Sequence, residues 1–251
     1  MRRLIGGVAA LGLGIALAAP AMGDVVYYTD WTSADVPGGT ASGVINVPGS
    51  ANPVSVGFKA INADGSDGSL YFAQTSGGTN YWQPDAPYIS SKVENGPPDA
   101  DILSLVGGVN QRYVVTLSEP IKDPVMSIVS LGSPSITITY DFDSPFEIVS
   151  QGQGYWGGGS SALVKLPDDV LQGTEGHGTI QFQGVFDTFS WTVPKPETWH
   201  GFTFGIRTTE ALEPGPGPVP VPLPAAAWTA LGMLGVLGAT KLVRRHQQRV
   251  A

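Results

Sequence analysis

One loop carries oxygen-bearing side chains at a spacing that could bind a cation. Residues 62–69 read NADGSDGS, which places Asn62, Asp64 and Asp67 close together between glycines. Calcium takes about six to eight oxygen ligands, including carboxylate and amide oxygens. The loop lacks the spacing of an EF-hand and its closing glutamate. Two interpretations stay open: a calcium site at Asn62, Asp64 and Asp67, or a polar hairpin loop, because Asp-Gly is also a strong turn signal.

A second loop could bind a ligand through aromatic rings. Residues 151–160 read QGQGYWGGGS, so Tyr155 and Trp156 stand between glycines, where their rings can lie exposed. Exposed aromatic faces can stack on sugar rings, and large exposed aromatic side chains often mark binding sites. The further aromatic residues that could join them are Trp31, Tyr81, Trp82 and Trp199. The alternative is that the tryptophans close the ends of an apolar core.

The pattern of ionisable residues in the sequence does not indicate a catalytic site. Glycoside hydrolysis needs two carboxyl groups about 5–10 Å apart across a cleft. The carboxylates considered for it are Asp141, Asp143, Glu147 and Glu175. His177 and His200 each lack a partner histidine at metal-binding spacing, and the sequence contains no Gly-x-Ser-x-Gly elbow. We therefore expect a protein that is not an enzyme, with no catalytic residues and no cofactor other than a calcium ion.

The elements that position these residues are predicted to be short strands. Apolar residues alternate with polar ones between clusters of Gly, Pro, Asn and Asp, as in half-buried antiparallel strands. The predicted strands lie at 54–58, 113–117, 125–131, 136–142, 161–166, 179–185, 188–193 and 202–206. This pattern predicts an all-β fold with a single antiparallel β-sandwich, jelly-roll-like, over residues 24–209. The chain has no cysteine, so its apolar core must stabilise it without disulfides.

The charge is unevenly distributed. Six of the 13 basic residues and none of the 21 acidic ones lie in the two ends, so residues 24–213 carry seven basic and 21 acidic residues, a formal net charge of −14. Such a surface repels phosphate groups, which argues against nucleic acid and anionic lipid as partners. It suits divalent cations and neutral or cationic polymers.

The first 23 residues have the composition of a signal peptide. Two arginines precede an apolar segment from Leu4 to Ala18, which would form the signal helix, and small residues follow. This order is typical of a cleavable secretory signal, with cleavage after Ala21 or after Gly23.

The C-terminal end has three parts. Residues 210–220 end in EPGPGPVP, where alternating Pro and Gly predict a semi-extended spacer. An uncharged apolar run from Ala225 to Thr240 follows, and then a tail with four basic residues, the first of them Lys241. An apolar helix followed by clustered positive charge is typical of a membrane span, and we expect a transmembrane helix over 224–242.

The residues before this helix resemble a known sorting signal. Val221, Pro222, Leu223, Pro224 and Ala225, followed by the apolar helix and the arginines, are similar to the VPLPA form of the PEP-CTERM signal. The resemblance implies processing by an inner-membrane exosortase in a Gram-negative cell. It implies an exported protein whose precursor is inserted in the inner membrane and whose mature form is at the cell surface or extracellular.

The body of the chain also resembles exported PEP-CTERM proteins. The similar stretches are 95–98, 101–103, 124–132, 173–178, 189–192 and 199–203. The resemblance implies a β-sandwich surface protein with a structural or adhesive role in exopolysaccharide or biofilm, and exopolysaccharide as a partner. Two alternatives remain: a carbohydrate-binding module using Tyr155 and Trp156, and a polysaccharide-active hydrolase.

Overall fold

The computed structural model describes residues 23–98 and 100–207. The predicted signal helix, the spacer at 210–220, the sorting motif at 221–225 and the transmembrane helix at 224–242 lie outside these residues. Within the part of the chain that is described, no helix is long and apolar enough to cross a membrane.

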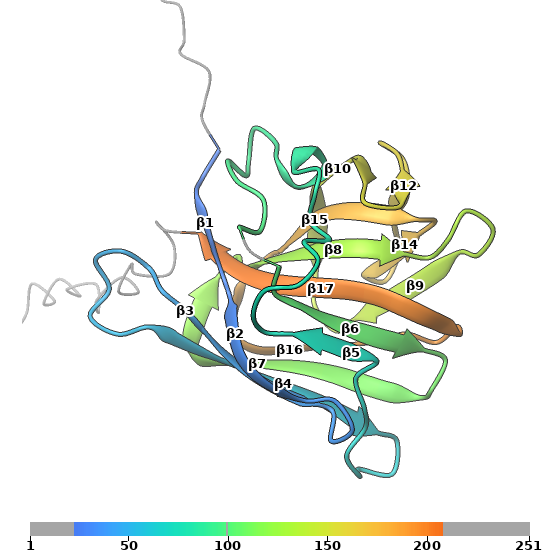
Figure 1. Cartoon of the computed structure of the whole chain (residues 1–251), viewed down its shortest axis with the longest axis horizontal. Helices are drawn as coiled ribbons and strands as arrows, with labels where there is room; N and C mark the ends of the chain where they lie inside the picture. The colour runs from blue at the N-terminus through green and yellow to red at the C-terminus, as the bar shows by residue number, and fades with distance from the viewer. Residues whose placement is uncertain (1–22, 99, 208–251) are drawn as a thin grey trace, which may run out of the picture. The chain divides into compact units, whose positions relative to one another are not determined.

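Two large antiparallel sheets form the body of the fold (Figure 1). The first sheet has the order β10 (Phe146–Gln151), β15 (Gly176–Phe182), β8 (Val125–Leu131), β17 (Glu197–Arg207), β6 (Ile102–Gly107) and β5 (Phe72–Gln74), with β1 (Val26–Tyr28) also paired to β17. The second has the order β13 (Leu163–Leu166), β14 (Val170–Gly173), β9 (Ile138–Phe142), β16 (Val185–Thr192), β7 (Gln111–Lys122), β4 (Val54–Asn62), β3 (Thr40–Ile45) and β2 (Asp30–Asp35). The prediction of an all-β fold is confirmed.

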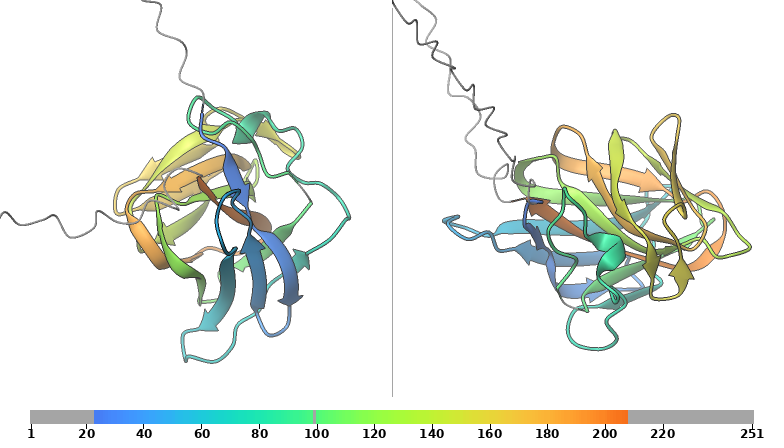
Figure 2. Two further views of the ribbon diagram at one scale, coloured as in Figure 1. Left: turned by 90° about the vertical axis from the view of Figure 1, so that its left-hand side faces the viewer. Right: turned by 90° about the horizontal axis from the view of Figure 1, so that it is seen from above.

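Successive central strands alternate between the two sheets. The chain passes from β6 in the first sheet to β7 in the second, to β8 in the first and to β9 in the second, and then returns through β14, β15, β16 and β17. Each returning strand pairs with its counterpart, so that β6 lies beside β17, β7 beside β16, β8 beside β15 and β9 beside β14. Figure 2 shows the two layers from two further sides, with the blue strands β2 to β4 extending the second sheet.

The two sheets pack face to face through aromatic side chains. Phe58 and Trp191 of the second sheet contact Phe202 of the first, with ring centroids 5.6 Å and 5.2 Å from it. All three side chains are buried, and burial of one such side chain contributes about 1.5–3 kcal/mol. This shared core confirms the predicted β-sandwich.

The outer face of the first sheet is covered in its centre. Every residue of β8 and of β15 is buried, whereas a sheet with one wet face would show alternation. The covering segment includes the short 3₁₀ helix η1 (Ala86–Tyr88). Trp82 and Tyr88 of this segment pack against Ile102 and Val129 of the sheet. The side chains of His177, His200 and Glu175, which lie in this region, are therefore largely shielded from water.

Candidate functional site

A short hairpin presents the predicted aromatic residues. Strands β11 (Gln153–Gly154) and β12 (Gly157–Gly158) pair with each other, and Tyr155 and Trp156 form the two-residue turn between them. Gly157 and Gly158 have φ values of 114° and 75°, a region that side chains with a Cβ rarely adopt. In this tight turn, Tyr155 and Trp156 are each 45 % exposed.

Four aromatic side chains gather here, which we call the aromatic cluster: Tyr81, Tyr155, Trp156 and Trp199. Tyr81 stacks on Trp156 with ring centroids 5.3 Å apart and planes 21° apart. Trp199 meets Trp156 edge to face at 4.5 Å, and Tyr155 meets Tyr81 at 5.3 Å. The rings come from three distant segments, so the cluster is a product of the tertiary fold.

The other tryptophans considered in the sequence lie in the interior. Trp31 and Trp82 are fully buried. Trp31 Nε1 donates a hydrogen bond to Thr203 Oγ1 (3.3 Å) and Trp82 Nε1 donates to the carbonyl oxygen of Asp101 (3.0 Å). The interpretation that tryptophans close the apolar core therefore holds for Trp31 and Trp82, and sugar binding by Tyr155 and Trp156 stays a prediction.

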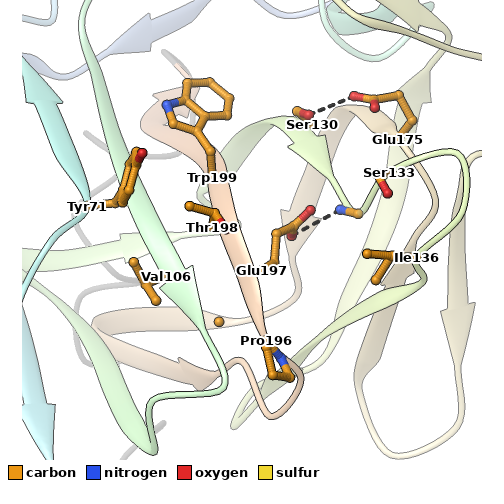
Figure 3. Close-up of a pocket in the computed structure, with 12 residues that line it drawn as sticks. Tyr71, Val106, Ser130, Ser133, Ile136, Glu175, Pro196, Glu197, Thr198 and Trp199 are labelled. Atoms are coloured by element: carbon orange, nitrogen blue, oxygen red, sulfur yellow. Dashed lines mark hydrogen bonds between the residues drawn. The ribbon is translucent and has the colours of Figure 1, made fainter.

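A groove of about 510 Å³ adjoins the aromatic cluster through Trp199 (Figure 3). Its walls come from the residue before β5, the end of β6, the end of β8 and the loop after it, the residue before β15 and the start of β17. The lining residues are Tyr71, Val106, Gly107, Ser130, Gly132, Ser133, Ile136, Glu175, Pro196, Glu197, Thr198 and Trp199.

Glu175 is one of two acidic residues in this groove. Ser130 Oγ donates a 2.6 Å hydrogen bond to Glu175 Oε1, and both residues are buried. The pairing of β15 with β8 shifts register between Gly176 and Gly178, next to Glu175. Burial raises the pKa of the Glu175 carboxyl group and the charge of Glu197 raises it further, while the hydrogen bond from Ser130 opposes both.

Glu197 is the second acidic residue in the groove. The backbone N–H of Gly132 donates a 3.1 Å hydrogen bond to Glu197 Oε2, and Nδ1 of His200 lies 2.8 Å from the same oxygen. Figure 3 shows both glutamates in the same groove, with Ser130 beside Glu175. The pairing of β17 with β6 shifts register between Glu197 and His200, so each glutamate lies at or beside an irregularity of the ladder.

Two buried histidines lie behind the carboxylates. Nε2 of His177 is 3.4 Å from Glu175 Oε1, and the phenol oxygen of Tyr88 is 3.4 Å from its Nδ1. Burial lowers the pKa of His177 to about 4, so this ring is neutral at pH 7. His200 is also fully buried. Neither histidine belongs to the metal site that the sequence predicts, which consists of Asn62, Asp64 and Asp67.

None of the other carboxylates considered from the sequence lines the groove of Glu175, and Asp141 and Asp143 line a separate pocket together with Arg112. Asp143 accepts hydrogen bonds from the backbone N–H and the hydroxyl group of Ser190, and Glu147 pairs with Lys92. Sequence reasoning missed Glu197. The signal that would have found it is the segment ETWHG at 197–201, which combines an acid, an indole and an imidazole at the start of a strand.

The predicted calcium loop is an internally bonded turn. Asn62 Nδ2 donates to Ser66 Oγ and to the carbonyl oxygen of Asp67. Ser66 donates to Asp64 Oδ1 from its backbone N–H and its hydroxyl group, which lowers the pKa of Asp64. Nζ of Lys59 lies 2.8 Å from Asp67 Oδ1.

These contacts account for the polar side chains of the loop. Across residues 23–98 and 100–207, no group of three or more His, Cys, Asp or Glu side chains is arranged to hold a metal ion. Calcium binding by the side chains of Asn62, Asp64 and Asp67 stays a prediction.

Comparison with known proteins adds no relative: no family model, no curated protein and no solved structure matches this chain. The site is therefore interpreted from its own geometry. That geometry joins exposed aromatic faces to a groove with two carboxyl groups, an arrangement suited to a polyhydroxylated ligand with a flat apolar face.

Proposed function

We propose that this protein is an exported cell-envelope protein that binds polysaccharide through the aromatic cluster and the adjoining groove. The observation that carries this proposal is the clustering of Tyr81, Tyr155, Trp156 and Trp199, with two of the rings nearly half exposed. Leaving large aromatic surface in water forgoes the free energy of burial. An exposed, pre-packed set of rings therefore indicates a surface that a ligand covers.

Sugar binding fits the shape and the polarity of this surface. The less polar face of a pyranose ring can stack on an indole or a phenol ring, and its hydroxyl groups can reach the serines and glutamates of the groove. Aromatic residues already held in contact with each other lose little conformational freedom on binding. We infer a structural or adhesive role in exopolysaccharide or biofilm, in which many weak sites act on one polymer.

The sequence supports an export route for this function. The signal peptide at 1–23 and the VPLPA-like motif at 221–225 indicate an inner-membrane precursor, an exosortase as partner, and a mature form at the cell surface or outside the cell. N-terminal sequencing and intact mass of the surface or medium fraction test this route. An intact 251-residue chain in the cytosol would contradict it.

The strand order supports the jelly-roll assignment as well. In a jelly roll, eight strands form two packed sheets with two Greek keys. Here a nested hairpin from β6 to β17 is rolled so that four of its strands lie in each sheet, with β1 to β5, β10 and β13 added around them.

Glycan binding by the exported protein tests the main proposal. We expect binding to at least one class of neutral or cationic polysaccharide, and a loss of about tenfold or more in affinity for Trp156→Ala, since tryptophan truncation at a binding centre typically costs about 2 kcal/mol. Val185→Ala is the matched control, because Val185 is 65 % exposed and outside the cluster. Equal binding by wild type and Trp156→Ala would refute the aromatic site.

A second function is favoured by one observation. Glu175, whose pKa is raised, shares its groove with Glu197, and glycoside hydrolysis uses two carboxyl groups, one of them as general acid. Release of reducing ends from a bound polysaccharide, abolished by Glu175→Gln, would establish a hydrolase. Binding without turnover would leave the adhesive function.

A further inference from the structure

We propose that the groove selects a cationic amino sugar: the ammonium group of a glucosamine-type residue pairs with the Glu175 and Glu197 carboxyl groups while neighbouring sugar rings stack on the aromatic cluster. This inference rests on the proposed polysaccharide-binding function and names the class of ligand for that site.

The charge of the groove is the first step. Two of its twelve lining residues are acidic and, among the residues described, none of them is a lysine or an arginine. The histidine behind Glu175 carries no compensating charge at pH 7, because burial lowers the pKa of His177 to about 4. A positive group is therefore the complement that the groove lacks.

The second step is the orientation of the carboxyl groups. Glu175 is bound through Oε1 by Ser130, and Glu197 is bound through Oε2 by the backbone of Gly132. Within the described chain, these bonds leave Glu175 Oε2 and Glu197 Oε1 without a donor. An ammonium group has three N–H donors and no acceptor, so it has enough donors for two carboxyl groups of one groove.

The third step is the link between the groove and the rings. Trp199 belongs to the aromatic cluster and also lines the groove. A sugar ring stacked against this indole can therefore direct a ring substituent into the groove. A free metal ion or a simple amine would use the carboxyl groups but would leave the exposed rings uncovered.

The net charge of the whole exported body also favours a cationic ligand. Residues 24–213 have a formal net charge of −14, which attracts polycations and repels polyuronates over distances of about 10 Å at ordinary ionic strength. The groove concentrates this preference at one place, because charges in a partly buried site are screened less than those on the open surface.

The experiment compares three oligosaccharides on the full exported protein: glucosamine oligomers with protonated amines, N-acetylglucosamine oligomers of equal length, and a polyuronate oligomer. We expect the glucosamine oligomers to bind about tenfold or more tightly than the acetylated ones, because a charge-assisted hydrogen bond is roughly twice as strong as a neutral one. We expect the polyuronate to bind weakest, and added salt to weaken glucosamine binding most.

The variants separate this inference from the function on which it rests. Glu175→Gln and Glu197→Gln should each reduce glucosamine affinity about tenfold and leave N-acetylglucosamine affinity within about twofold, since only the charged contact is removed. Glu119→Gln, which removes one exposed carboxylate from β7 outside the groove, should leave both affinities unchanged. Thermal unfolding of each variant checks that the sandwich is intact.

The possible results distinguish failure of the amino-sugar inference from failure of the proposed polysaccharide binding. Equal affinity for the amine and acetylated oligomers, with both lost in Trp156→Ala, refutes the amino-sugar inference and leaves polysaccharide binding in place. Amine selectivity that survives both glutamate substitutions also refutes the inference. Failure of all three oligomers to bind refutes the inference, and failure across a wider glycan set refutes the proposed function as well.

Discussion

Ser130, near the end of β8, and Glu175, the residue before β15, have the same unusual backbone conformation, φ = 57° and φ = 56°, and Ser130 Oγ donates a 2.6 Å hydrogen bond to Glu175 Oε1. For residues other than glycine, this left-handed region costs roughly 1–2 kcal/mol each. Such conformations persist where the surrounding structure enforces them, and they cluster at functional sites. Both of these residues line the same groove.

Removal of the serine hydroxyl group tests this pair. In Ser130→Ala the Glu175 carboxylate loses the donor that favours its charged form, so we expect the pKa of Glu175 to rise further. Carbon-detected NMR titration of the glutamate carboxyl groups measures it. A pKa that falls or stays constant would contradict the assigned role of the hydrogen bond.

The raised pKa of Glu175 predicts a specific dependence of stability on pH. Between the unfolded and the folded pKa values the native state binds more protons, so the free energy of unfolding decreases as pH rises through the folded pKa. Glu175→Gln should remove this loss and be more stable than wild type at pH 7. Denaturant unfolding across pH checks the sign, and a variant less stable than wild type at pH 7 would count against it.

The lowered pKa of His177 predicts the opposite dependence of stability on pH. Its folded pKa is about 4 against the ordinary 6.5, so the unfolded state binds more protons between these values and stability falls as pH falls through this range. The full effect of a shift of this size is about 3 kcal/mol. His177→Phe, whatever its stability at pH 7, should lose less stability than wild type between these pH values, and an unchanged loss would reject the assignment.

Gly158 and Gly159, which follow Trp156 in the hairpin segment, should differ in how well they tolerate substitution by alanine. A Cβ at Gly158 would lie 2.2 Å from the carbonyl oxygen of Glu175, at a φ of 75°, whereas a Cβ at Gly159 meets no atom within 4 Å. We expect Gly158→Ala to lower the free energy of unfolding by about 1–3 kcal/mol and to weaken glycan binding. Gly159→Ala is the control, and equal effects of the two substitutions would contradict the described hairpin.

Phe202 tests the contact between the two sheets. Its ring is fully buried against Trp31, Phe58 and Trp191, so Phe202→Ala should destabilise the protein by about 3–5 kcal/mol. Val185→Ala, at an exposed position of β16, should change stability by less than about 0.5 kcal/mol. Chemical denaturation distinguishes these values, and a small effect at Phe202 would contradict a shared core.

Local pattern predicted many of the strands. The alternation at 54–58 marks β4, one face of which meets the core. The alternation at 202–206 marks part of β17, where Phe202, Phe204 and Ile206 lie in the core and the residues between them are buried as well. The pattern failed for β2, whose sequence DWTSAD is mostly exposed at the edge of its sheet. It also could not indicate that β8 and β15 are covered on both faces, since the covering segment comes from a distant part of the chain.

The binding surface was predictable only in part. Glycines around Tyr155 and Trp156 pointed to an exposed turn, and the structure places these residues at the tip of the hairpin. Tyr81 and Trp199 were named without a position, and only the fold brings them to the hairpin. Glu197 escaped sequence reasoning because its importance depends on Glu175, which reaches the same groove from another strand.

By itself, the sequence determined the strand-rich character of the body, its strongly acidic charge and the residues free to stand out on a glycine turn, because each of these depends on composition or on neighbours a few positions away. The tertiary structure decided which aromatic rings meet, which tryptophans are buried and which two glutamates share a groove. These relationships depend on how β6 to β17 nest between two sheets, and that pairing joins residues too far apart in the chain for any local pattern to specify.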